Sequence, residues 1–134
     1  MRPATERALV GDEMWSFLER AFPICRSITG AGLRETLGML AERLPGLEIV
    51  EIESGTPVLD WVVPDEWNVR EAWLRSESGE TIVDFAHSNL HLMSYSVPIS
   101  GTFSLQALRE GNHLYTLPEH PDRIPYRTSY YRPH

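Results

Sequence analysis

Two histidines four residues apart, His87 and His91, are the first candidates for chemistry in this chain of 134 residues. On a helix, side chains at i and i+4 share a face and could hold a zinc ion together. However, Thr81–Phe85 favours a strand and Ser88-Asn89 favours a turn. On an extended strand the two imidazoles would lie ~13 Å apart. We therefore expect histidines that hydrogen-bond within a loop, and we predict no metal ligands in this chain.

A polar turn after the first helical pattern contains two more candidates, Cys25 and Arg26. A cysteine becomes a nucleophile when a histidine stands beside it, whereas a lone cysteine more often fills an apolar gap. An arginine could hold a substrate carboxylate through a two-pronged hydrogen bond. It could equally form an ion pair that ties the turn to the next element. The residues leave both interpretations of Arg26 open.

Two tryptophans, Trp61 and Trp67, flank Pro64 in an unusually mixed stretch of aromatic and ionisable residues. Such a pair can stack on a sugar or a peptide ring, or it can cover the seam between two structural layers. We favour the seam. Asp65 and Glu66 are adjacent, so their side chains diverge on any regular element. They predict a solvated turn rather than an acid–base pair.

The charge of the chain argues against two classes of partner. The formal net charge is −7, and all twelve basic residues are scattered arginines. Phosphate-backbone binding requires a positive stripe, so we expect no nucleic-acid partner. An anionic membrane surface is excluded by the same reasoning.

Localisation can be predicted from three further features of the sequence. Cys25 is the only cysteine, so no disulfide can form within the chain, which suits a reducing compartment. The segment Met1–Val10 has no apolar signal core, and no run approaches the ~20 apolar residues of a membrane span. We expect a cytoplasmic protein.

The first third of the chain predicts two helices and a strand. After a loose leader at residues 1–10, Asp12 can cap a helix from about Glu13 to Phe22. A second helix is expected over residues 31–44, with leucines at helical spacing. Leu47–Glu53 then predicts a strand rich in isoleucine and valine.

The rest of the chain is richer in proline, aromatic and β-branched residues. It predicts a hairpin that turns at Ser78-Gly79, between strands at residues 68–76 and 80–85. Ser104 is expected to cap a short helix over Leu105–Glu110. Further strands are predicted at Met93–Val97, Gly101–Phe103 and His113–Leu117. The tail from Pro118 reads as an extended connector, and the apolar fraction of 42% predicts a packed core.

Several segments, in order along the chain, resemble a family of bacterial zinc aminopeptidase-like proteins with an inserted β-rich domain. They are Phe22–Gly30, Asp60–Arg70, Ser88–His91, Tyr95–Pro98, Leu117–Pro121, Ile124–Tyr126 and Thr128–Tyr131. The resemblance implies an α+β fold. Residues 1–55 would start a peptidase-like α/β core, residues 56–124 would form the inserted β-rich domain, and residues 125–134 would return to the core.

The resemblance also implies a function. In the family, the zinc-binding residues follow the paired tyrosines, beyond the last residue of this sequence. We therefore expect the amino-terminal portion of a zinc aminopeptidase-like protein, inactive by itself, with no cofactor in this chain and zinc and a peptide substrate in the full-length protein. The alternative is a stand-alone module that binds a peptide or a saccharide. The substrate-binding candidates are Arg26, Asn89, His91, Tyr130 and Tyr131.

The apolar stripes of the two predicted helices indicate that the chain needs a partner to cover them. Each helix offers one apolar stripe, and a single strand over Leu47–Glu53 cannot cover both stripes. We expect an open surface through Leu33, Leu37, Leu40 and the Leu47–Ile52 edge. Self-association or a complementing chain would cover it.

Overall fold

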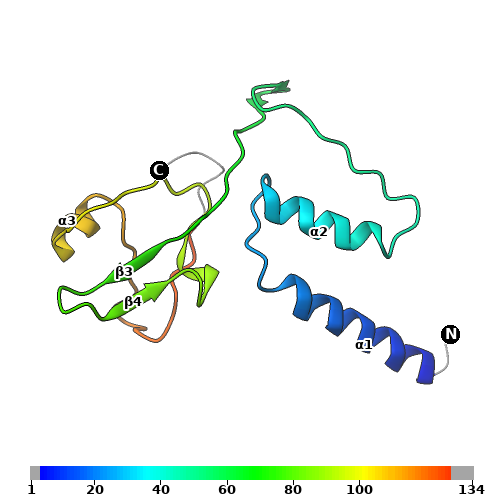
Figure 1. The fold of residues 1–134 in the computed structure, drawn as a ribbon, viewed down its shortest axis with the longest axis horizontal. Helices are drawn as coiled ribbons and strands as arrows, with labels where there is room; N and C mark the ends of the chain where they lie inside the picture. Colours follow the sequence, from blue (N-terminus) through cyan, green and yellow to red (C-terminus); the bar gives the residue numbers. More distant parts are fainter. Residues whose placement is uncertain (1–3, 128–134) are drawn as a thin grey trace. The chain divides into compact units, whose positions relative to one another are not determined.

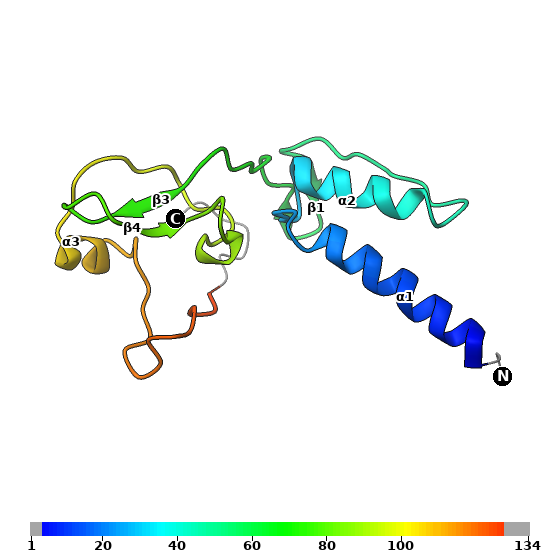
Figure 2. The same ribbon diagram turned by 60° about the horizontal axis from the view of Figure 1, so that its bottom comes forward.

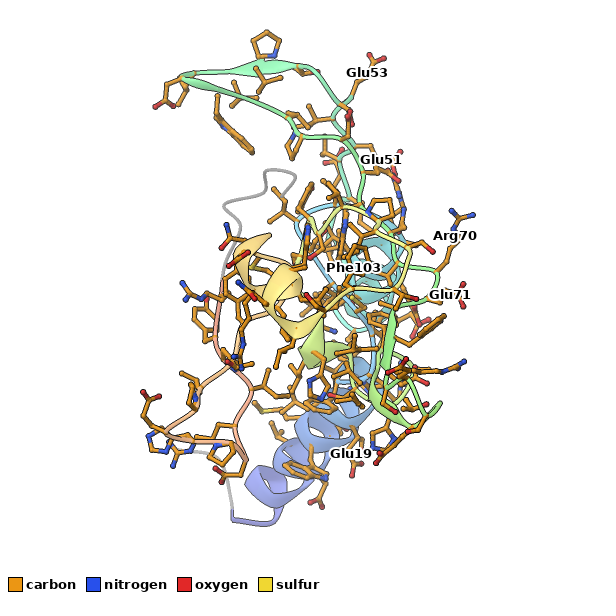
Figure 3. All side chains as sticks on the ribbon, turned by 90° about the vertical axis from the view of Figure 1, so that its left-hand side faces the viewer. Glu19, Glu51, Glu53, Arg70, Glu71 and Phe103 are labelled. Atoms are coloured by element: carbon orange, nitrogen blue, oxygen red, sulfur yellow. The ribbon has the colours of Figure 1, made fainter. Side chains whose placement is uncertain are left out.

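The structure is a computed structural model that describes residues 4–127. The chain forms two compact units, Met1–Arg70 and Glu71–His134, which we describe separately (Figure 1). Figure 3 labels Arg70 and Glu71, the two residues at this boundary. Helices and small antiparallel sheets make the chain a mixed α+β protein, as predicted. None of the described helices is long and apolar enough to cross a membrane.

Two helices open the first unit, α1 (Ala4–Ala21) and α2 (Ala31–Ala41). The prediction of a loose leader was wrong, because α1 already begins at Ala4. The first residues of α1 include alanine, glutamate, arginine and leucine, which are strong helix formers. The second helix begins as predicted but ends at Ala41 rather than residue 44. Its last turn tightens there, since the amide of Arg43 donates to the carbonyl of Leu40 at 3.0 Å.

The strand predicted at Leu47–Glu53 is absent from the structure. A strand is defined by hydrogen bonds to a neighbour, and no other described segment pairs with these residues. Instead, β1 (Pro57–Val58) and β2 (Trp61–Val62) form a small antiparallel hairpin that the sequence did not predict. No glycine or asparagine occurs at this turn in the sequence. Leu59 adopts the left-handed region, with φ 51°, where those two residues are more common.

The second unit is built on the predicted hairpin. Strands β3 (Trp73–Arg75) and β4 (Thr81–Asp84) pair antiparallel, with Trp73 opposite Asp84, and both are shorter than predicted. The turn closes when the amide of Ser76 donates to the carbonyl of Glu80 at 2.8 Å. Gly79 has φ 89°, which a side chain would disfavour. A short 3-10 helix, η1 (Asn89–His91), follows β4 and contacts it.

Three strands predicted for the second unit do not form, at Met93–Val97, Gly101–Phe103 and His113–Leu117. In the first of these, Tyr95 is buried and has φ 66°, which breaks the alternation of an extended strand. The amide and hydroxyl of Ser96 both donate to the carbonyl of Met93, at 3.2 and 2.7 Å. The segment is therefore a buried turn.

The short helix α3 (Leu105–Glu110) has the predicted bounds. Its predicted cap is also confirmed, because the hydroxyl of Ser104 accepts a hydrogen bond from the amide of Ala107 at 3.1 Å. Leu108 is the buried residue of this helix. Figure 2 shows α3 beside the β3–β4 hairpin within the second unit.

The prediction of a packed core was wrong for the described residues. Among them, only three hydrophobic side chains are buried, those of Ala21, Tyr95 and Leu108. Each unit has only thin layers, a pair of helices or a two-stranded sheet, and a thin layer cannot cover both of its own faces. The apolar residues are present, but nearly all of them remain at least partly exposed.

The cap of α3 gives a test of the second unit. We predict that Ser104→Ala lowers the free energy of unfolding by about 1 kcal/mol, because the Ala107 amide loses its acceptor. Ser104→Asp should retain most of this stability. Urea denaturation followed by circular dichroism measures the change, with the exposed Ser100→Ala as the matched control. Equal midpoints for Ser104→Ala and the wild type would contradict the assignment of the cap.

Candidate functional site

The first candidate, Arg26, lies in the turn between α1 and α2. Its side chain is exposed, and Nη1 donates a hydrogen bond to the carbonyl of Ala21, the last residue of α1. The guanidinium therefore satisfies a carbonyl at the helix C-terminus, where a positive charge is also favourable. This contact supports the structural interpretation of Arg26. The substrate-binding role of Arg26 stays a prediction.

The neighbouring thiol is unsuited to nucleophilic attack. Cys25 is half-buried, and burial raises the pKa of its thiol, against a smaller opposing effect of the Arg26 charge. The thiolate is the reactive form, so a raised pKa disfavours reactivity at neutral pH. The structure favours Cys25 as an apolar filling residue.

A set of long-range hydrogen bonds joins this turn to the stretch around Trp67. We call it the turn clamp, and it consists of Thr29, Gly30, Ala31, Trp67 and Asn68. The hydroxyl of Thr29 accepts from the amide of Trp67 at 3.1 Å. The side-chain oxygen Oδ1 of Asn68 accepts from the amide of Ala31 at 2.7 Å. Asn68 thereby caps α2 across 37 positions of sequence, since Gly30 has no side chain to do so.

The two glycines around the start of α2 are fixed by close approach of other backbone. A Cβ on Gly30 would lie 2.5 Å from the carbonyl oxygen of Trp67, and Gly30 has φ 90°. A Cβ on Gly32 would lie 1.9 Å from the carbonyl oxygen of Cys25. Real Cβ atoms do not tolerate such distances, so both positions require glycine.

Beside the turn clamp, Arg34 of α2 joins two distant carboxylates. Its Nε donates to Glu51 at 2.8 Å, and its Nη2 donates to Glu66. The hydrogen bond from Arg34 lowers the pKa of Glu66, and the same contact raises the pKa of Arg34. Glu51 is labelled in Figure 3. Because all three side chains are exposed, we assign them a modest stabilising role.

The candidates of the second unit lie at η1. Asn89 is half-buried and His91 is exposed at the end of this short helix. The turn before them is held by Asp84, whose carboxylate accepts from the amide of Ala86 at 2.9 Å. The carbonyl of Asp84 also accepts from the amide of His87 at 3.1 Å. The structure thus places Asn89 and His91 in one hydrogen-bonded turn, while their role in substrate binding stays a prediction.

The remaining candidates, Tyr130 and Tyr131, lie outside the described residues. Within residues 4–127, no three side chains of His, Cys, Asp or Glu come together as they would around a metal ion. The described residues therefore do not fit the zinc ion that the aminopeptidase resemblance implies.

Sequence reasoning missed the partners that the structure places around the turn. It interpreted Glu66 as part of a solvated turn, but Glu66 is paired with Arg34. It did not single out Thr29 or Asn68 as partners. One signal was available in the sequence, the run Gly30-Ala31-Gly32 at the start of a predicted helix. None of these residues has a side chain that can cap the helix, so the cap has to come from a distant residue.

The glycines provide a matched pair of variants. We predict that Gly30→Ala destabilises the first unit by 2 kcal/mol or more, about the size of other strained backbone sites, because its Cβ collides with Trp67. Gly38→Ala, inside α2 with nothing within 4 Å of the new Cβ, should instead stabilise it by about 1 kcal/mol. Urea denaturation measures both changes. Changes of the same sign would show that Gly30 is not sterically required.

The Arg34–Glu66 pair predicts a pH dependence. The folded-state pKa of Glu66 is depressed, so its contribution is complete above the ordinary value of 4.5 and is lost as the pH falls through the folded-state pKa. We expect Glu66→Gln to be less stable than the wild type at pH 7, by a small amount because the pair is exposed. The two proteins should converge on acidification. A gap that persists at pH 2 would contradict this origin.

Comparisons with known proteins agree with the peptidase-like resemblance. A protein of Clostridium acetobutylicum named "Putative polysaccharide biosynthesis protein with aminopeptidase-like domain" is 50% identical over 122 residues. The match covers 91% of this chain and 27% of that protein. A crystal structure described as a "putative peptidase" from Clostridium acetobutylicum is 49% identical to this chain, with a TM-score of 0.82. The match covers 92% of this chain and 29% of the chain in that crystal structure.

The family assignment rests on the second half of the sequence. Residues 66–134 match the family described as "Domain of unknown function (DUF2172)". This range contains β3, β4, η1 and α3, and it is more than half of the chain. The chain therefore belongs to the DUF2172 family.

Proposed function

We propose that this chain is the amino-terminal portion of a zinc aminopeptidase-like protein and is not catalytic by itself. The observation that carries the proposal is the extent of the matches. At about 50% identity, the chain aligns with less than a third of each peptidase-like relative. More than two thirds of each relative is therefore outside the aligned part.

In this proposal the zinc ligands and the substrate-binding residues lie in different parts of the protein. Hydrolysis at zinc needs carboxylate and imidazole ligands around the metal, and the described residues 4–127 do not supply a group of them. The ligands would come from polypeptide beyond residues 1–134. Arg26, Asn89 and His91, with Tyr130 and Tyr131, would contact a peptide substrate in the complete cytoplasmic protein.

The proposal also includes an arrangement of domains. Residues 1–55 would begin the α/β peptidase core, residues 56–124 would be the inserted β-rich domain, and residues 125–134 would return to the core. The two hairpins, β1–β2 and β3–β4, both lie in the part assigned to the insertion. Strands would then be confined to the inserted segment, which favours the division, whereas the compact units divide between Arg70 and Glu71 and leave β1–β2 in the first unit.

A second candidate function is a saccharide-binding module. The observation that favours it is Trp73, whose side chain is 53% exposed on β3 with the guanidinium of Arg75 at 4.4 Å from its ring centroid. An indole held in place by a cation can stack on the apolar face of a sugar. One relative also carries polysaccharide biosynthesis in its name.

Metal content and hydrolysis test the main proposal. We predict far less than one zinc per chain after dialysis, and no release of p-nitroaniline from aminoacyl p-nitroanilides. A longer reading frame that includes the remainder of the protein should hydrolyse them. Stoichiometric zinc in residues 1–134, lost in the His91→Ala variant, would overturn the proposal.

Saccharide binding is tested separately, by titrating soluble oligosaccharides against tryptophan fluorescence. Binding that is lost in Trp73→Ala and retained in Trp61→Ala would favour the second function. Trp61 is the matched control because it is also exposed on a short strand, β2.

A further inference from the structure

One face of α1 is apolar and has no cover within the described residues. It carries Met14, Trp15 and Leu18, and Phe22 extends it in the turn just after α1, where its amide donates to the carbonyl of Leu18 at 2.8 Å. The exposed fractions of these four residues are 62%, 64%, 56% and 74%. With 100° between successive residues, all four fall within about 100° of arc on the helix. We call this set the α1 face. Four large apolar side chains in one stripe exceed the scattered exposure that is normal for a surface.

The opposite side of α1 already has partners within the first unit. Arg20 approaches Glu42 at 4.0 Å, and the guanidinium of Arg43 lies 5.6 Å from the ring centroid of Phe17. Phe17 and Arg20 lie roughly opposite Trp15 on the helix. These two contacts come from Glu42 and Arg43, which directly follow α2, and they leave the α1 face uncovered within the described residues.

Gly11 lies on the same side of α1 as the α1 face, one turn before Trp15. A glycine inside a helix costs about 1 kcal/mol relative to alanine. No described atom lies within 4 Å of a Cβ built at Gly11, so the described residues give no steric reason for a glycine there. A small residue in an apolar stripe allows another backbone to approach closely, which suggests a partner that packs lengthwise.

The spacing on the α1 face indicates a helix as that partner. Trp15, Leu18 and Phe22 follow intervals of three and four residues, the pattern of a helix–helix seam. A strand would match alternate residues instead. The seam covers about two turns, so it can accommodate a helix of ordinary length.

The charge beside the seam indicates which helix would fit. Asp12 and Glu19 are both exposed, seven residues apart, and form an acidic border on the Trp15 side of the α1 face (Figure 3 labels Glu19). A second copy of α1 would bring an acidic border of its own to a chain whose net charge is already −7. Lysine or arginine on the partner would instead pair with this border.

We propose that the α1 face docks an amphipathic helix of a partner polypeptide whose apolar seam is bordered by lysine or arginine. This surface is distinct from the turn clamp and from the η1 turn. The proposal rests on the apolar surface and the charges of α1, and not on zinc or peptidase chemistry.

Two designed peptides test the proposal. Both are amphipathic 21-residue helices with leucine along the seam, one with lysine and the other with glutamate at every border position. Tryptophan fluorescence and calorimetry should show that the lysine peptide binds about 3- to 10-fold more tightly, as expected for one or two exposed ion pairs. This preference should shrink in the Asp12→Asn, Glu19→Gln double variant, whose changes are at exposed residues.

Two further variants locate the binding surface. Leu18→Asp should abolish binding of the lysine peptide, whereas Leu90→Asp, a change at an equally exposed leucine of the second unit, should not. Equal affinity for both peptides, or equal loss in both variants, would overturn the proposal. A concentration-dependent dimer in sedimentation that Leu18→Asp dissolves would also overturn it, by showing that a second copy covers the α1 face.

Discussion

The first unit depends on one steric constraint, the contact of Gly30 with the carbonyl of Trp67. Because no Cβ fits between them, the start of α2 can approach the Trp67-Asn68 backbone closely enough for Asn68 to cap the helix and for Thr29 to accept from Trp67. Arg34, one turn into α2, is then within reach of Glu51 and Glu66. Segments up to 38 positions apart in sequence are joined without a large apolar core.

These hydrogen bonds explain how the described chain can have ordered elements while it buries few apolar side chains. Backbone and side-chain hydrogen bonds fix the turn clamp and the η1 turn, while the apolar side chains of α1 and of the segment 47–52 remain exposed. Large exposed apolar surface is the usual mark of an interface. The chain also aligns with less than a third of relatives that are more than three times its length.

The sequence predicted the parts of the fold that are governed by local signals. The Ser104 cap and the glycine turn at residue 79 were both predicted, because their determinants lie within a few residues. Predictions failed where the determinant is distant or missing. Leu47–Glu53 has strand composition but no pairing neighbour, and Tyr95 adopts a left-handed conformation as a buried residue of a turn. Of the candidate site, Arg26, Asn89 and His91 are placed on ordered turns, whereas the role of Asn68 could not be read from its own neighbours.

Asn68 and Gly30 hold the turn around Arg26 in place. Native-state hydrogen exchange at the amides of Ala31 and Trp67 tests this claim most directly, because each amide donates one bond of the turn clamp. We expect both amides to be protected to a similar degree. Asn68→Ala should expose both, whereas Asn68→Asp should retain their protection. Exchange of Ala31 and Trp67 at the rate of an unstructured peptide in the unaltered protein would contradict the claim.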